Sequence, residues 1–113
     1  LRKGLLNLLE SLITEVQMII ELSVIPIGVG TSLSKYVACV MRVIKESGLK
    51  YESHSMATNI ECDWDDITPL VKKCHDELKK MGVERISSSV RISERTDKPY
   101  TMEGKMISLE EKL

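Results

Sequence analysis

Phenylalanine is absent from this 113-residue sequence and tryptophan occurs once, so aromatic platforms for stacking nucleic-acid bases are scarce. A surplus of one charge sign is missing too, because 16 basic and 17 acidic residues leave a net charge of −1. Such a chain has no overall field that attracts nucleic acid or an anionic membrane. No apolar run approaches the ~20 residues of a transmembrane helix. We therefore expect neither nucleic acid nor a membrane as a partner.

Cysteine is sparse, and its count is odd. Cys39, Cys62 and Cys74 show no CxxC spacing. This pattern argues against a disulfide framework or a zinc site and favours a reducing compartment. We expect a cytoplasmic protein whose length suits one small domain.

The first 17 residues read differently from the rest. Leucine and isoleucine recur there at helical spacing and form an apolar stripe, namely Leu5, Leu8, Leu9, Leu12 and Ile13. We expect an accessory amphipathic helix in residues 1–17, docking on its own or a neighbouring subunit, ahead of a domain at 18–113. The alternative is a simple upstream extension of a domain that starts at Met18.

The remaining chain alternates between strand and helix patterns. Strict alternation predicts a strand from about residue 16 until Pro26 and Gly28 end it. The other expected elements are a helix at about 33–47, a hairpin over 49–62, a helix at 63–82, a strand at 84–92 and a short helix at about 105–112. The order β-α-β-β-α-β indicates an α+β, ferredoxin-like two-layer sandwich with an antiparallel sheet, a short C-terminal helix and the N-terminal amphipathic helix. Right-handed crossovers place both main helices on one sheet face and leave the other face open.

Helix ends and stripes can be predicted as well. Thr31 or Ser32 is expected to cap the first main helix, and Asp65 or Asp66 the second, with Pro69 in its first turn. The expected apolar stripe of the first main helix comprises Leu33, Val37, Val40, Met41 and Ile44.

The stretch "VIPIGVGTSLSKYV" resembles a phosphate-binding turn. A dinucleotide fingerprint needs a third glycine where Leu33 stands, and Lys35 is not placed as in a P-loop. The favoured interpretation is that Gly28 and Gly30 allow a tight strand-to-helix connection. Backbone amides that contact an anionic or polar ligand remain the alternative.

Metal and catalytic motifs are weak. Cys74 and His75 are adjacent, so on a helix they diverge by ~100° and cannot easily share one ion. The carboxylate pairs Asp65–Asp66 and Glu110–Glu111 fall at helix ends, where capping and solvation explain them. We expect no metal, no cofactor, no catalytic residue and no enzymatic activity.

The open sheet face carries more informative chemistry. Glu21 and Ser23 on the first strand should lie beside the third strand, which holds Thr58, Asn59 and Glu61. Carboxylates, hydroxyls and an amide could hold a small polar, cationic ligand. Alternatively, these groups satisfy one another across an oligomer interface.

Three blocks carry a resemblance: "ELSVIPIGVGTSLSKYVA", "MATNIECDWDDI" and "RISERTDKPYTMEGK". Over residues 18–113 the chain resembles the small thiamine-binding protein family, whose relatives include the YkoF hydroxymethylpyrimidine/thiamine-binding proteins. The resemblance implies ferredoxin-like subunits that assemble through their sheets into homodimers or homotetramers. It also implies binding of thiamine or its pyrimidine moiety without catalysis.

Side-chain chemistry and this partial motif together suggest the ligand-binding residues. The candidates are Glu21, Ser23, Ile25, Ile27, Thr58, Ile60 and Glu61. The carboxylates would accept from the ligand's amine, the hydroxyls would donate or accept, and the isoleucines would form apolar walls. Two alternatives remain: a structural or regulatory oligomeric module without a ligand, and an enzyme acting on a thiamine-like heterocycle.

Overall fold

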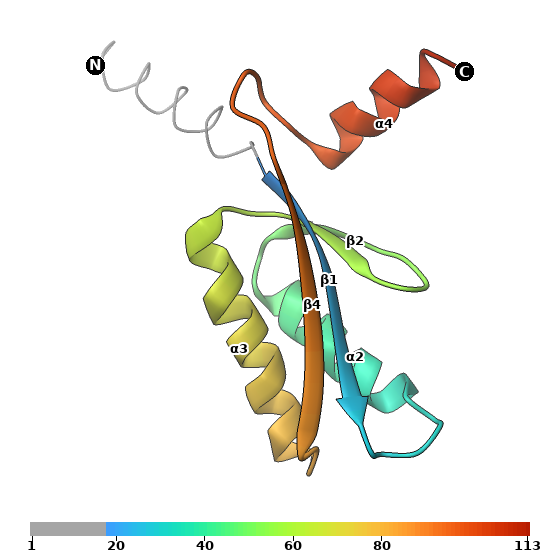
Figure 1. Ribbon diagram of the computed structural model, residues 1–113, viewed down its shortest axis with the longest axis vertical. Coiled ribbons are helices and arrows are strands. Elements are labelled where there is room, and N and C mark those ends of the chain that lie inside the picture. Colours follow the sequence, from blue (N-terminus) through green and yellow to red (C-terminus); the bar gives the residue numbers. More distant parts are fainter. Residues whose placement is uncertain (1–17) are drawn as a thin grey trace.

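The computed structural model describes residues 18–113, which form four strands and three helices (Figure 1). In chain order these are β1 (Met18–Ile27), α2 (Ser34–Glu46), β2 (Lys50–Ser53), β3 (Thr58–Glu61), α3 (Trp64–Lys80), β4 (Arg85–Glu94) and α4 (Met102–Glu110). The expected helix in residues 1–17 lies outside the described residues, and the boundary at residue 18 stays a prediction. None of the described helices is long and apolar enough to cross a membrane.

The sheet has the strand order β2-β3-β1-β4, and all neighbouring strands are antiparallel. β1 pairs with β4 along all ten of its residues, from Met18 opposite Glu94 to Ile27 opposite Arg85. β3 pairs only with the first half of β1, from Ile19 to Leu22. The predicted α+β, ferredoxin-like architecture is confirmed.

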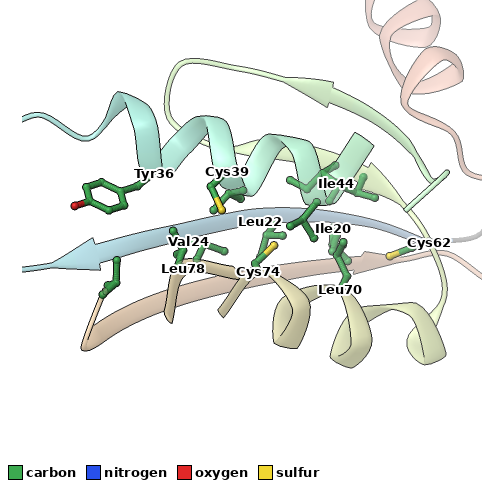
Figure 2. Close-up of a cluster of buried hydrophobic side chains, with 14 of the residues drawn as sticks. Ile20, Leu22, Val24, Tyr36, Cys39, Ile44, Cys62, Leu70, Cys74 and Leu78 are labelled. Carbon is green, nitrogen blue, oxygen red and sulfur yellow. The ribbon is translucent and has the colours of Figure 1, made fainter. Parts of the chain in front are cut away.

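Alternation along β1 separates the two faces of the sheet. Met18, Ile20, Leu22, Val24 and Pro26 are buried, whereas the residues between them are half-buried or exposed. The buried side chains pack against α2 and α3, which also contact each other (Figure 2). Both main helices therefore cover one face of the sheet, and the opposite face lacks them.

The first main helix differs in detail from its prediction. α2 begins at Ser34 after Leu33, and no side chain caps its first turn, so capping by Thr31 or Ser32 is wrong. Its buried stripe is Tyr36, Cys39, Val40, Val43 and Ile44. Val37, which was expected in the stripe, leaves 49% of its surface exposed. Tyr36 and Val43 face the core in place of Val37. The helix is therefore rotated about its axis relative to the prediction.

The second main helix has a different N-cap from the predicted one. Asp63, not Asp65 or Asp66, is the N-cap: its carboxylate accepts from the N–H of Asp65 at 2.9 Å. The Asp66 carboxylate accepts from the N–H of Asp63 at 3.0 Å and completes a capping box. Pro69 is consequently the sixth helical residue, beyond the first turn, and removes one internal backbone hydrogen bond.

The C-terminal helix starts three residues before its predicted position. Thr101 caps α4 by accepting from the N–H of Gly104 at 2.9 Å. Met102 is buried, whereas Met106, Ile107 and Leu109 are about half exposed. Figure 1 shows α4 projecting away from the two main helices. The apolar residues of α4 are therefore largely uncovered by the described chain.

The glycine-rich connection between β1 and α2 requires an unusual backbone conformation. Gly28 has φ +82° and Gly30 has φ +92°, a region that residues with a Cβ rarely adopt. A Cβ at either position would meet no atom within 4 Å. The glycines are needed for the path of the chain, which supports the interpretation as a connector.

Candidate functional site

The open face of the sheet is polar on β4 and mixed on β1. Register places Glu21 opposite Arg91 on one side and Asn59 on the other. Farther along, Ser23 faces Ser89 and Ile25 faces Ser87. These side chains share one face because alternate residues of a strand point to the same side.

A hollow of about 340 Å³ lies between this face and the start of α4. We call it the α4 hollow. Its apolar side chains come from Ile19, Met102 and Met106. Its polar lining comes from all four strands, from the turn between β2 and β3 and from α4: Glu21, Glu52, His54, Asn59, Arg91, Ser93 and Lys105. This volume is at the lower end of the ~300–1,000 Å³ typical of small-molecule sites.

The lining carries both charge signs. Glu21 and Glu52 supply carboxylates, whereas Arg91 and Lys105 supply cations. The His54 Nε2 lies 3.9 Å from the Glu52 Oε2. The Lys105 Nζ donates to the Tyr100 Oη at 2.9 Å. That oxygen also lies 3.1 Å from the Ser93 Oγ.

The two contacts of the Tyr100 hydroxyl have an electrostatic consequence. The hydrogen bond from Lys105, followed by that from Ser93, lowers the pKa of the Tyr100 phenol. The same chain of contacts ties α4 to β4 at one side of the hollow.

Glu61 holds α4 in place at the other side of the α4 hollow. Its Oε1 accepts a hydrogen bond of 2.7 Å from the backbone N–H of Met102, the first residue of α4. A carboxylate at this position satisfies one free backbone donor and suits the positive end of the helix dipole. Glu61 thus anchors the helix that forms one wall of the hollow.

The structure separates the predicted site residues into four groups. Glu21 lines the α4 hollow, and Glu61 faces the same side and anchors α4. Ser23, Ile25 and Ile27 lie on the open face but farther along β1 than the hollow lining.

Two candidates lie on the opposite side of the sheet. Thr58 pairs with Leu22, and Ile60 with Ile20, so both side chains face the helical layer. They are 6% and 0% exposed, and the Thr58 hydroxyl donates to the sulfur of Met41. The structure therefore does not place Thr58 or Ile60 with the other candidates, because alternation along β3 sends them to the core.

Several lining residues were missing from the predicted set. Arg91 and Ser93 could have been found from the alternation of β4, which puts them opposite in phase to Val90 and Ile92. Asn59 follows from the same argument on β3. Glu52 follows too, because it is the partner of Asn59 across the β2–β3 hairpin. Met102, Lys105 and Met106 had no such signal, because the position of α4 depends on contacts between distant segments.

Comparison with known proteins places the chain among relatives over most of its length. A model of the family described as "Thiamine-binding protein" matches residues 20–110. The UPF0045 protein sll0230 of Synechocystis is 46% identical over 93 residues, covering 82% of this chain and 77% of that protein. The UPF0045 protein MJ1052 of Methanocaldococcus jannaschii is 39% identical over 95 residues, covering 84% and 94%.

Solved structures agree with these matches. The crystal structure of MJ1052 superposes with a TM-score of 0.77 at 38% identity, covering 85% of this chain and 98% of that chain. A Thermotoga maritima protein, TM0486, shares the fold with a TM-score of 0.70 at 20% identity, covering 82% and 98%. From the extent of the family match and the identity to its relatives, the chain belongs to the thiamine-binding protein family.

Proposed function

We propose that this protein binds thiamine or a related pyrimidine-containing precursor in the α4 hollow, without chemical change to the ligand. The family match over residues 20–110 carries the proposal. The side chains that line the hollow also have chemistry suited to such a ligand. Glu21 and Glu52 offer carboxylates for an exocyclic amine or a cationic ring, and Asn59 offers both a donor and an acceptor.

Apolar groups in the hollow suit the flat rings of such a ligand. Ile19, Met102 and Met106 line it, and methionine side chains adapt to irregular shapes and contact aromatic rings favourably. Ser23, Ile25 and Ile27 extend the same face beyond the hollow, where they would meet a larger ligand or a second subunit.

Calorimetric titration with thiamine and with hydroxymethylpyrimidine tests this proposal. We expect saturable binding of at least one compound, weakened about tenfold or more in Glu21→Gln, because a hydrogen bond to a charged group contributes about 1.5–3 kcal/mol. Glu84→Gln removes an exposed carboxylate outside the hollow and is the matched control. Absence of binding of both compounds contradicts the proposal, and conversion of the recovered ligand to a product indicates an enzyme.

We further propose that the chain forms homodimers or homotetramers through the open face. Ile25 and Ile27 leave 47% and 37% of their surfaces exposed there, and α4 exposes Met106, Ile107 and Leu109. These are two separate apolar patches at opposite ends of β1, and exposed apolar surface of this kind commonly marks an interface. A purely structural or regulatory module would use the same surface without a ligand.

Light scattering coupled to size-exclusion chromatography separates these cases. Ile25→Asp should lower the measured mass. Val37→Asp, which changes an equally exposed residue on the helical layer, should not. A wild-type monomer contradicts assembly. An oligomer that binds neither thiamine nor hydroxymethylpyrimidine favours the structural module.

The cysteines bear on the compartment. Cys39, Cys62 and Cys74 are free and buried. Free thiols are usual in reducing compartments, so we propose a cytoplasmic location.

A further inference from the structure

The α4 hollow contains a cation that makes no ion pair with a carboxylate of the described residues. Arg91 lines the hollow and lies directly opposite Glu21 across the β1–β4 ladder. Among residues 18–113, however, its guanidinium makes neither a hydrogen bond nor an ion pair, with Glu21 or with any other group. Two neighbouring groups of opposite charge are thus both available to a bound molecule.

A second cation faces the same space. Lys105 reaches the hollow from the first turns of α4, and within residues 18–113 its ammonium donates a hydrogen bond only to the Tyr100 hydroxyl, at 2.9 Å. The Ser93 hydroxyl lies on β4 next but one to Arg91 and contacts the same phenol oxygen at 3.1 Å. Arg91 and Lys105 are therefore two cations of the hollow that make no ion pair within residues 18–113.

One of the carboxylates that line the hollow lies across it from Arg91. β1 separates β3 and β2 from β4, so Glu52 on β2 and Arg91 on β4 come from opposite edges of the sheet, with Glu21 between them. The lining is thus negative toward β2 and positive toward β4 and α4. A ligand with a cation alone would gain from the carboxylates but would be repelled by Arg91 and Lys105.

We propose that the α4 hollow selects a phosphate monoester of its pyrimidine-containing ligand, such as thiamine monophosphate, over the unphosphorylated compound. This inference rests on the proposed function. Arg91 would bind two phosphate oxygens through its planar fork, and Lys105 would add a point charge. Glu21 and Glu52 would receive the amine or the cationic ring at the other end.

The test compares affinities for thiamine and thiamine monophosphate, and for hydroxymethylpyrimidine and its phosphate, by calorimetry at fixed pH and ionic strength. We expect the phosphorylated member of a pair to bind at least tenfold more tightly, with a preference that falls as salt rises. Inorganic phosphate should compete with the phosphorylated ligand.

Variants assign that preference to residues. Arg91→Gln and Lys105→Gln should each reduce the ratio of affinities, phosphorylated over unphosphorylated, at least fivefold. Arg85→Gln is the matched control, since Arg85 is exposed on the same strand and the same face, opposite Ile27 and outside the hollow. Circular dichroism of each variant verifies folding, and Lys105 on α4 provides a test independent of the sheet.

The outcomes distinguish the two proposals. Binding of thiamine or hydroxymethylpyrimidine without preference for the phosphate overturns this inference and leaves the proposed function standing. An equal loss of the ratio in Arg85→Gln and Arg91→Gln also overturns it, because a general charge effect then explains the preference. Absence of binding of all four compounds overturns both.

Discussion

The Glu61 carboxylate on β3 accepts a 2.7 Å hydrogen bond from the backbone N–H of Met102, 41 residues later in the chain. This contact ties the first residue of α4 to the open face of the sheet. The wall of the α4 hollow that α4 provides therefore depends on a strand residue that does not itself line the hollow.

Replacing Glu61 should release this end of α4. We expect Glu61→Ala to lower the free energy of unfolding by about 1.5–3 kcal/mol, the usual contribution of a hydrogen bond to a charged group. Glu61→Gln keeps an acceptor and should lose less. Chemical denaturation gives the stability, and a thiamine titration of the same proteins should show weaker binding in Glu61→Ala.

Glu103→Gln is the control for that experiment. Glu103 is a carboxylate of α4 itself, and its contact with Lys50 is 3.8 Å long and exposed. Exposed ion pairs contribute little to stability. If Glu103→Gln loses as much stability as Glu61→Ala, the hydrogen bond between Glu61 and Met102 contributes no more than an exposed ion pair.

The capping box of α3 makes a second prediction. Asp63→Ala should cost about 1 kcal/mol, with a range of ~0.5–2 kcal/mol, because the N–H of Asp65 loses its acceptor. Asp65→Ala should cost less, since it removes only a charge near the helix start. Thermal denaturation of the two variants decides which aspartate is the cap, and a larger cost for Asp65→Ala contradicts the assignment.

The connector between β1 and α2 provides a third prediction. Gly30→Ala forces a Cβ onto a residue with φ +92° and should destabilise the fold by about 1–3 kcal/mol. Thiamine affinity should stay unchanged, because the α4 hollow lies elsewhere. Ser32→Ala, in the same connector, should change stability little, because no side chain caps α2. Strongly weakened ligand binding in Gly30→Ala would reopen the possibility of a ligand-binding turn.

The buried thiols predict a pH dependence. Burial, followed by the charges of Asp66 and Asp63, raises the pKa of Cys62 to about 12, and burial raises that of Cys74 to about 11. An unfolded thiol has a pKa of about 9, so above that pH the unfolded state loses protons that the folded state retains. The contribution of these thiols to stability is therefore complete below pH 9 and falls as pH rises from about 9 toward 11–12.

Urea denaturation at pH 8 and pH 10.5 measures this loss. A Cys62→Ala, Cys74→Ala double variant should lose less stability over the same interval than the wild type, although it is less stable at pH 8 because it loses buried volume. Identical losses in the two proteins would show that other groups cause the pH dependence.

Sequence patterns predicted the fold well because local alternation and topology rules determine it. The period-two pattern of Met18, Ile20, Leu22 and Val24 identified the buried face of β1. The order of elements then placed both helices on that face. Helix starts were less predictable: Leu33 precedes α2 without a side-chain cap, despite the nearby Thr31 and Ser32.

The candidate site could be predicted only in part. Glu21 was identified because it interrupts an apolar strand on its open side. Thr58 and Ile60 were chosen for chemistry and resemblance, although the alternation of a four-residue strand already separates them from Asn59 and Glu61. The contribution of α4 was missed because its position depends on Glu61 and Tyr100, contacts that no local pattern encodes.

Unequal pairing along β1 has a consequence for how another chain could join the sheet. Within the described residues, Ser23–Ile27 have a strand neighbour only on the β4 side, so one row of their backbone groups is unsatisfied by the sheet. Pro26, which lacks an N–H, is tolerable at such an edge and limits how far an incoming strand could extend the ladder. An incoming strand would thus pair at the opposite end of β1 from the α4 hollow, so a substitution at Ser23–Ile27 could alter such pairing without touching Ile19 or Glu21.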